Sequence, residues 1–330
     1  MHRHGKAHLE HESLELLTPP PEERLLSWLA EFYGKPVPIT GRQQLRHRDL
    51  SFVERLWIAD GLPQSLIYKV VLPPWDVEQD LHERVLIPSL SNSAQLYMSA
   101  NYGPLTALFL EDLGTCSLLN HGTAETASRV GKELAKLHRA YSYRTDELLQ
   151  MHVVRTLFPL DYEEFAAALS EQLLKWRLIN RHEAKKLRLL ANLIAPKLAG
   201  EPISLVHGDL YAENLILRHD RLFIVDWSWF TILGVPIMDL ATVTMEHVKN
   251  GTFTRWRDAL IDAYCFESGR ELADVREILP LAETLSRLLF LYWLVERRGR
   301  GIMGTTVGPV DEVIPQVVEE LSARLSLIPA

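Results

Sequence analysis

The chain has 330 residues and a mass of 37.8 kDa, a length that favours two domains or two lobes and excludes one small module. Hydrophobic residues make up 47% of it and charged residues 24%, which is typical of a folded protein with a sizeable core. The net charge of -8 argues against a basic groove for nucleic-acid phosphates. We therefore expect neither DNA nor RNA as a partner.

The two cysteines and the longest apolar run indicate the cellular setting. Cys116 and Cys265 lie far apart and cannot form a framework of disulfides, which favours a reducing, cytoplasmic location. The run from Leu288 to Val295 has eight residues, fewer than the roughly 18 that a membrane span needs, so we expect no membrane partner. Residues 1–20 contain several histidines and no apolar signal segment, and they predict a flexible tail.

The first third of the sequence alternates helices with short strands. Glu22 to Tyr33 carries large apolar residues at helical spacing and ends before Gly34, which predicts a helix. Ser51 to Ile58 and Ser65 to Val71 are typical of antiparallel strands, and Asp60-Gly61 between them predicts a two-residue hairpin. The other elements predicted before residue 115 are a helix over Asp76 to Ile87, closed by Pro88, and a strand over Leu105 to Leu110.

Beyond Gly122 the pattern is mainly helical, beginning with a helix over Thr123 to Tyr141. Short apolar strands interrupt it at Ser204 to His207, Leu215 to Leu217 and Leu222 to Val225, and helical patterns resume near Asp239. The sequence therefore predicts an α+β protein with two lobes. A small antiparallel-sheet lobe takes residues 21–114, and a larger, mainly helical lobe takes residues 115–330.

The residues that can do chemistry gather between Val206 and Asp239. Asn214 follows the aspartate of His207-Gly208-Asp209 by five positions, and Asp226 ends an apolar strand. Phosphoryl transfer needs a carboxylate that accepts the proton of the attacking hydroxyl, and oxygen ligands that hold Mg²⁺ against the nucleotide phosphates. Asp209 suits the first role, and Asn214 and Asp226 suit the second. The alternative interpretation is a pair of polar turns that cap short strands.

These residues resemble the aminoglycoside phosphotransferase and choline kinase family of small-molecule kinases, which shares the protein-kinase-like fold. The likeness rests on His207-Gly208-Asp209 with Asn214, on Ile224 to Trp227, on Gly234-Val235-Pro236 with Asp239 to Ala241, and more weakly on Leu110 to Gly114 and Leu134 to His138. It covers about residues 40–245. The resemblance implies that Asp209 is the catalytic base, that Asn214 and Asp226 bind magnesium, and that Asp239 is structural and braces the loop.

The resemblance also implies a lysine on the third strand that contacts the nucleotide phosphates, and Lys69 fits this position, with a solvated edge residue as the alternative. Its expected partner is a glutamate on the following helix, either Glu78 or Glu83. Glu78 shares a helix face with Leu81 and Val85. Glu83 turns away from that face, so we choose Glu78.

The phosphate loop and the hinge are less distinctive. Arg46 to Phe52 contains no glycine for close approach to a phosphate, so we expect Ser51 to supply a hydroxyl and a backbone N–H, with a solvated hairpin tip as the alternative. The backbone from Glu111 to Leu113 is expected to meet the edge of the nucleotide base. Ser228 to Phe230 departs from the family, because relatives commonly carry an acidic or amide residue there.

The acceptor is expected to bind in the helical lobe, where a cationic acceptor would require carboxylates or an aromatic cage. The candidates are the carboxylates Glu213, Glu246, Asp262 and Glu296 and the rings Trp227, Trp229, Trp256, Tyr292 and Trp293. Rings at helical spacing are more often core than cage, so core packing is the alternative for them.

We therefore predict a phosphotransferase that uses Mg²⁺ and moves the γ-phosphate of ATP or GTP to a hydroxyl of a small molecule, such as an aminoglycoside, a choline-like or a sugar-like acceptor. The main alternative is a catalytically impaired nucleotide-binding or regulatory protein of the same fold. A protein kinase is disfavoured because no Ala-Pro-Glu element follows Asp226.

Overall fold

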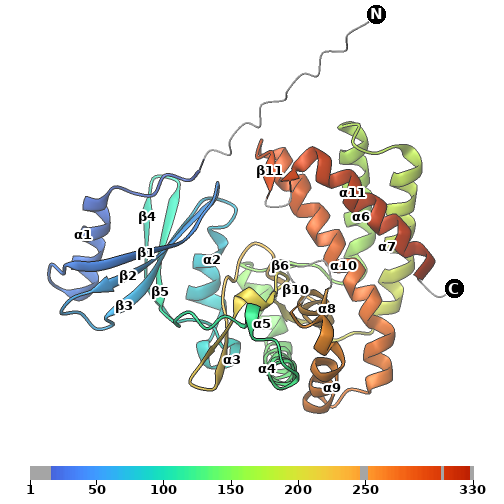
Figure 1. Cartoon of the computed structure of the whole chain (residues 1–330). Coiled ribbons are helices and arrows are strands. Elements are labelled where there is room, and N and C mark those ends of the chain that lie inside the picture. Colours follow the sequence, from blue (N-terminus) through green and yellow to red (C-terminus); the bar gives the residue numbers. More distant parts are fainter. Residues whose placement is uncertain (1–15, 246–251, 306–307, 328–330) are drawn as a thin grey trace, which may run out of the picture. The chain divides into compact units, whose positions relative to one another are not determined.

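The chain folds into two compact units in the computed structural model, which describes residues 16–245, 252–305 and 308–327. One unit comprises Met1–Trp75 and Met98–Leu110, and the other comprises Asp76–Tyr97 and Glu111–Ala330. The predicted α+β organisation is confirmed, with a small antiparallel sheet in one unit and mainly helices in the other (Figure 1). Most of the predicted tail, residues 1–15, lies outside the described residues.

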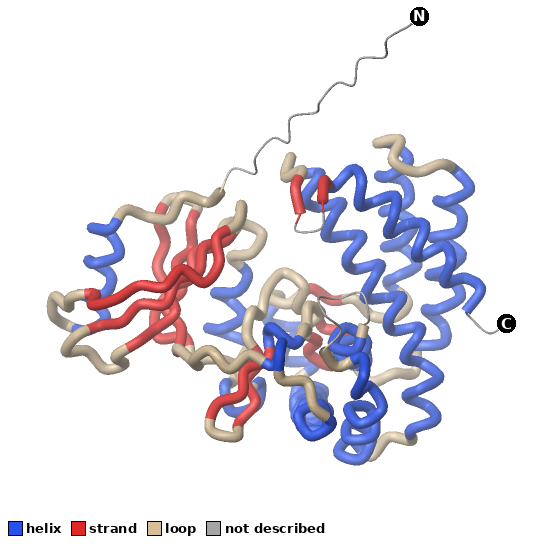
Figure 2. Tube along the Cα trace, in the orientation of Figure 1, coloured by secondary structure: helices blue, strands red, loops and turns tan. Residues whose placement is uncertain are grey.

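The first unit is built around a sheet, whose strands are red in Figure 2. It has five strands in the order β1-β2-β3-β5-β4. Its strands are β1 (Ile39–His47), β2 (Ser51–Ile58), β3 (Ser65–Val71), β4 (Leu96–Tyr102) and β5 (Leu105–Glu111). Helix α1 (Glu22–Tyr33) has the predicted bounds and ends at Gly34 in a left-handed cap. Its Trp28 packs edge-on against Phe109 of β5, with 6.2 Å between the ring centroids, so helix and sheet share one apolar core.

The connection between β2 and β3 corrects the predicted two-residue hairpin. The strands end at Ile58 and resume at Ser65, so residues 59–64 form the loop. Helix α1 supplies the reason, because the Tyr33 hydroxyl donates a hydrogen bond to the carbonyl of Pro63 at 2.7 Å. The Tyr33 ring also lies so close to Gly61 that a Cβ there would meet Cε1 at 2.6 Å. The loop between β2 and β3 therefore packs against helix α1.

The second unit is mainly helical. Its helices are α2 (Val77–Asp80), α3 (Pro88–Ser91), α4 (Ala124–Ser142), α5 (Thr145–Met151), α6 (Asp161–Lys175), α7 (Arg181–Leu198), α8 (Ile237–Thr244), α9 (Arg257–Ser268), α10 (Leu272–Gly299) and α11 (Val310–Ala323). Helices α6, α7, α10 and α11 pack together as a bundle, and α4 packs against α9 (Figure 1). Thr123 caps α4 by accepting a hydrogen bond from the Thr126 amide at 3.1 Å, which agrees with the predicted start.

The helix predicted over Asp76 to Ile87 is shorter and changes its pitch. α2 passes into a π-helical turn, η1 (Leu81–Val85), in which the Leu86 amide donates to the Leu81 carbonyl at 2.8 Å. Glu78 is 1% exposed and Leu81 and Val85 are fully buried, whereas Glu83 is exposed. The structure therefore places Glu78 on the inward face, as the helical spacing predicted.

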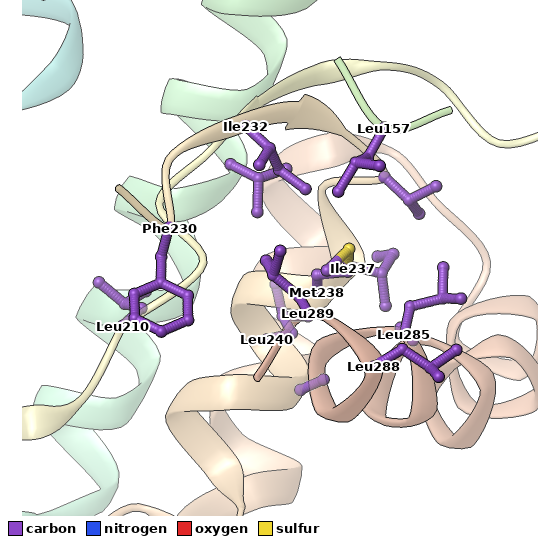
Figure 3. Close-up of a cluster of buried hydrophobic side chains, with 14 of the residues drawn as sticks. Leu157, Leu210, Phe230, Ile232, Ile237, Met238, Leu240, Leu285, Leu288 and Leu289 are labelled. Carbon is purple, nitrogen blue, oxygen red and sulfur yellow. The ribbon is translucent and has the colours of Figure 1, made fainter. Parts of the chain in front are cut away.

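Small sheets position the loops of the second unit. β6 (Arg155–Thr156), β10 (Ile232–Gly234) and β7 (Ser204–Val206) form one sheet, β8 (Leu215–Arg218) and β9 (Arg221–Ile224) form a hairpin, and β11 (Gly304–Thr305) pairs with β12 (Gly308–Pro309). Figure 3 shows Ile232 of β10 and the neighbouring Leu157 facing Met238 of α8 and Leu285 of α10 across one apolar cluster. The sheet that carries β7 and β10 is thus anchored on α8 and α10.

Helix α10 is long and apolar enough to cross a membrane by length and composition alone. In the structure 61% of its most apolar 18-residue window is buried inside the protein. Its Leu285, Leu288 and Leu289 belong to the cluster of Figure 3. Such burial is typical of a core helix.

Candidate active site

The predicted catalytic residues lie where two short strands of the second unit end. β7 leads into His207-Gly208-Asp209, and a single turn, η3 (Ala212–Asn214), then leads into β8. The β8–β9 hairpin returns the chain, with Leu215 opposite Ile224. Beside this pair the Val225 amide donates to the Asn214 carbonyl at 2.9 Å. Asn214 and Asp226 therefore stand on neighbouring segments at the open end of the hairpin.

Asn214 also joins this hairpin to the catalytic loop. Its Nδ2 donates a hydrogen bond to the backbone carbonyl of Asp209 at 2.9 Å, and the residue is 3% exposed. This bond directs the amide oxygen of Asn214 away from the loop backbone. Asp209 and Asp226 are half-buried. The structure thus brings together the three residues to which the sequence assigned proton acceptance and metal binding.

Tyr211 is a site residue that the sequence analysis missed. Its phenol hydrogen-bonds the Asp209 side chain. Burial raises the pKa of the Tyr211 phenol strongly, and the negative charge of Asp209 raises it further. The phenol therefore stays protonated and acts as a donor that fixes the Asp209 carboxylate. No periodicity or known spacing marks a tyrosine two positions after the aspartate for this role.

Asp239 holds the backbone of the catalytic loop, the bracing role that the resemblance implied for it. It lies in the first turn of α8 and is 0% exposed. Its two oxygens accept hydrogen bonds from the amides of His207 and Gly208, each at 2.9 Å. The His138 ring meets the same carboxylate at 3.2 Å and the Tyr264 hydroxyl at 3.1 Å. Helices α4, α8 and α9 thus fix the loop together.

His207 ties the loop to the segment after β9 that carries Asp226. Its Nε2 lies 3.1 Å from the carbonyl of Val225, and its Nδ1 accepts a hydrogen bond from the Asp209 amide at 3.3 Å. The ring packs on Trp227 with 4.7 Å between centroids. Trp227 is fully buried, and its Nε1 donates to the Ile224 carbonyl at 3.0 Å. The imidazole therefore sets the spacing between Asp209 and Asp226.

We expect Gly208→Ala to disrupt the loop. Gly208 has a φ of +76°, and a Cβ there would meet the Phe230 carbonyl oxygen at 2.3 Å. Strain and overpacking together should cost at least about 3 kcal/mol of unfolding free energy, measured by urea titration. Gly269→Ala is the matched control, because Gly269 has a φ of +75° with nothing within 4 Å of the built Cβ. It should cost about 1–2 kcal/mol, and equal losses in the two variants would contradict the close-approach argument.

The hinge residues lie beside the β8–β9 hairpin. The Glu111 carboxylate accepts from Nη1 of Arg218 at 2.7 Å, and the same nitrogen donates to the Asp112 carbonyl at 3.3 Å. The Leu113 side chain packs with Ala94 and Phe223 in a small apolar cluster. These contacts fix the backbone path of residues 111–113. That this backbone pairs with a nucleotide base stays a prediction.

Lys69, Ser51 and Glu78 are placed on the elements that the sequence indicated. Lys69 lies on β3 and is 5% exposed, and Ser51 is the first residue of β2. Both belong to the first unit, whereas Glu78 on α2 belongs to the second. Their contacts with a nucleotide stay predictions.

The acceptor candidates do not form an empty aromatic cage in the described part of the chain. The Trp227 ring packs on His207, Trp229 and Tyr292 lie against Arg155, Trp256 against Arg255, and Trp293 against Arg297. Among the carboxylates, Asp262 lies 3.9 Å from Arg276, and Glu296 accepts a hydrogen bond from Tyr292. Glu246 lies outside the described residues. The core interpretation is therefore the better one for these rings.

The metal-binding prediction fits the donor chemistry of the site. Within the described ranges no group of three or more His, Cys, Asp or Glu side chains could hold a metal ion. Mg²⁺, however, is commonly held by one or two protein oxygens together with substrate phosphates and water. The amide oxygen of Asn214 and the carboxylate of Asp226 are ligands of this kind, and their segments are hydrogen-bonded side by side.

Comparison with known proteins assigns the chain to a family. The model of the phosphotransferase enzyme family matches residues 106–278, which is more than half of the chain and includes the whole catalytic loop. The chain belongs to this family, and the predicted resemblance is confirmed. Its class is thus that of a small-molecule phosphotransferase.

A curated relative and three solved structures are similar to the chain. Protein LicA of Haemophilus influenzae is 28% identical over 100 residues, which cover 29% of this chain and only 36% of that protein. The choline kinase LicA from Streptococcus pneumoniae is similar with a TM-score of 0.61 at 13% identity, over 92% of this chain and 98% of that one.

A choline kinase from Cryptosporidium parvum gives a TM-score of 0.59 at 10% identity, over 93% and 95% of the two chains. A spectinomycin phosphotransferase in complex with ADP and spectinomycin gives 0.57 at 12% identity, over 94% and 99%. These structures confirm the kinase-like fold.

Proposed function

We propose that this protein transfers the γ-phosphate of ATP to a hydroxyl group of a small molecule. The observation that carries the proposal is the continuous connection from Asp209 through Asn214 to Val225, the residue before Asp226. It gathers one proton acceptor and two oxygen ligands into one loop system, as phosphoryl transfer requires. ATP is the proposed donor because the solved spectinomycin phosphotransferase and a hygromycin-bound aminoglycoside phosphotransferase carry ADP.

In the proposed mechanism each residue of the loop has one task. The Asp209 carboxylate accepts the proton of the acceptor hydroxyl as the oxygen approaches the phosphorus. Tyr211 holds this carboxylate through its phenol, and Asp239 holds the loop backbone behind it. Asn214 and Asp226 would hold Mg²⁺, which when bound offsets the negative charge of the phosphates.

The nucleotide contacts of Lys69, Glu78, Ser51 and the backbone of 111–113 belong to the proposal and rest on the sequence resemblance. A cytoplasmic location also belongs to it. The support for that location is the cysteine usage, since Cys116 and Cys265 are both free thiols.

We expect Asp226→Ala to weaken the binding of Mg²⁺·ATP. Loss of a partner in the outer shell of a metal site costs about 10- to 100-fold in metal affinity, so loss of a ligand should cost at least that much. Isothermal titration of ATP with and without Mg²⁺ measures the effect. Asp220→Ala is the matched control, because Asp220 shares the left-handed backbone, with φ of 58° against 65° for Asp226, and its side chain is 94% exposed.

Equal affinities in the two variants would contradict the assignment of Asp226. Magnesium-dependent binding of ATP by the wild type, with no ADP release for any acceptor, would instead support the alternative of a nucleotide-binding protein without turnover.

A further inference from the structure

The Arg155 guanidinium lies against two aromatic rings beside the active site. Its Cζ lies 4.1 Å from the centroid of the Trp229 ring and 4.9 Å from that of Tyr292. The two rings are themselves 5.3 Å apart and inclined by 34°. Trp229 and Tyr292 are two of the rings considered above for binding a cationic acceptor. Arg155, a cation of the protein itself, already lies over both rings.

Among the described residues no carboxylate forms a hydrogen bond or an ion pair with Arg155 of β6, in contrast to three arginines of the C-terminal region. Arg287 is bonded to Glu320, Arg298 to Asp311 and Arg324 to Glu283. In the described part of the chain, by contrast, Nη1 of Arg155 is buried and has no hydrogen-bond partner. Burial lowers the pKa of the guanidinium, and electrostatic interactions with Tyr292 and Glu296 offset this only in part. A buried charge without a partner is costly, so a bound anion would stabilise it.

Arg155 and the strand that leads into the catalytic loop belong to one sheet, β6-β10-β7. Arg155 faces Ile232, and Ile232 faces Val206, the residue before His207. Because neighbouring strands lie about 4.8 Å apart, about 10 Å separate the backbones of Arg155 and Val206. Trp229 follows Asp226 by three positions. The residue as a whole is half-buried, so part of it still meets solvent.

We propose that Arg155 binds an anionic group, a carboxylate or a phosphate, of the acceptor whose hydroxyl Asp209 deprotonates. A guanidinium offers parallel N–H donors that match either anion. This inference rests on the proposed function, which it deepens by naming the substrate class. According to this proposal, the acceptor is a hydroxy acid or a hydroxylated phosphate ester. A quaternary ammonium compound bound by Trp229 and Tyr292 is excluded.

The test compares neutral and anionic members of two series of hydroxylated compounds. One set is glycerol, glycerate and glycerol 3-phosphate, a second is glucose, gluconate and glucose 6-phosphate, and choline is the cation. Binding to the full chain with Mg²⁺ and ADP is measured by saturation-transfer NMR, and ADP release from Mg²⁺·ATP is measured in parallel. We expect one anion to bind at least about 10-fold more tightly than its neutral parent, as charge-assisted hydrogen bonds predict.

Variants separate recognition from packing. Arg155→Met keeps the length of the side chain and should remove that preference by raising the KM of the anion, with little change in kcat or in ATP affinity. Arg155→Lys should retain part of it. Arg298→Met is the matched control, because Arg298 also lies over a ring, Trp176 at 4.3 Å, but is bonded to Asp311. It should leave the preference intact.

Three results would overturn the proposal: no probe binds, choline or a neutral parent binds best, or the preference for the anion survives in Arg155→Met. The anion that binds most tightly within a set shows whether Arg155 recognises a carboxylate or a phosphate. If ATP does not bind, the proposed function is rejected separately. The two failures can be told apart because the NMR titration measures binding of the probes at Arg155 and does not depend on turnover.

Discussion

Asp209→Asn should lower kcat by about 10²- to 10⁴-fold, the usual contribution of a general base, while the affinity for Mg²⁺·ATP stays within about twofold. The reason is that asparagine has the same shape but cannot accept the hydroxyl proton. The hydrogen bonds of Asp209 with His207 and Asn214 use its backbone amide and carbonyl, so the substitution keeps them. Steady-state ADP release gives kcat, and calorimetry gives the nucleotide affinity.

Asp258→Asn is the control for this experiment, since its side chain on α9 is 81% exposed and its bond to Arg276 lies on the surface. Surface pairs of this kind contribute little, and the control should retain full turnover. An Asp209→Asn enzyme with wild-type kcat would remove Asp209 from the role of base. A parallel loss of nucleotide affinity and kcat would indicate a metal-binding role for it instead.

The second large effect is expected at Asp239. Asp239→Ala removes the acceptor of two backbone amides, those of His207 and Gly208, and leaves the His138 ring without its carboxylate. Breaking a buried, charge-assisted group of this kind costs about 3–5 kcal/mol. Urea unfolding, followed by the fluorescence of the tryptophans, measures the free energy of unfolding.

Asp274→Ala is the matched control for Asp239, because each aspartate lies in the first turn of its helix. Asp274 is exposed, so its loss should cost only the 0.3–1 kcal/mol of a charge near a helix N-terminus. Asp239→Asn keeps one acceptor oxygen, so its loss of unfolding free energy should lie between those of Asp239→Ala and Asp274→Ala. If Asp239→Ala were no less stable than Asp274→Ala, the carboxylate would not brace the loop.

The parts of the site that the sequence predicted are those fixed by short spacing. Asp209 and Asn214 lie five positions apart, and the hairpin that returns the chain to Asp226 is local, so neighbouring positions imply neighbouring atoms. The choice of Glu78 over Glu83 as the inward residue followed in the same way from the period of one helix, even though that helix tightens into a π-helical turn.

The parts that escaped prediction depend on contacts distant in sequence. Arg155 meets Trp229 only because β6 pairs with β10, and Tyr292 comes from a third element, α10. The loop between β2 and β3 is longer than predicted because Tyr33 of α1 holds it against the helix. Local propensity carries no information about a ring or a guanidinium that another element delivers.

The most direct test of the central claim follows the phosphorus itself. Wild-type protein is incubated with Mg²⁺·ATP and each acceptor probe, and ³¹P NMR records the products beside an Asp209→Asn sample. We expect a phosphomonoester resonance that grows in proportion to ADP with one acceptor and is lost in the variant. Inorganic phosphate as the only product, or an unchanged ATP spectrum with every probe while the nucleotide is bound, would contradict phosphoryl transfer to a small-molecule hydroxyl.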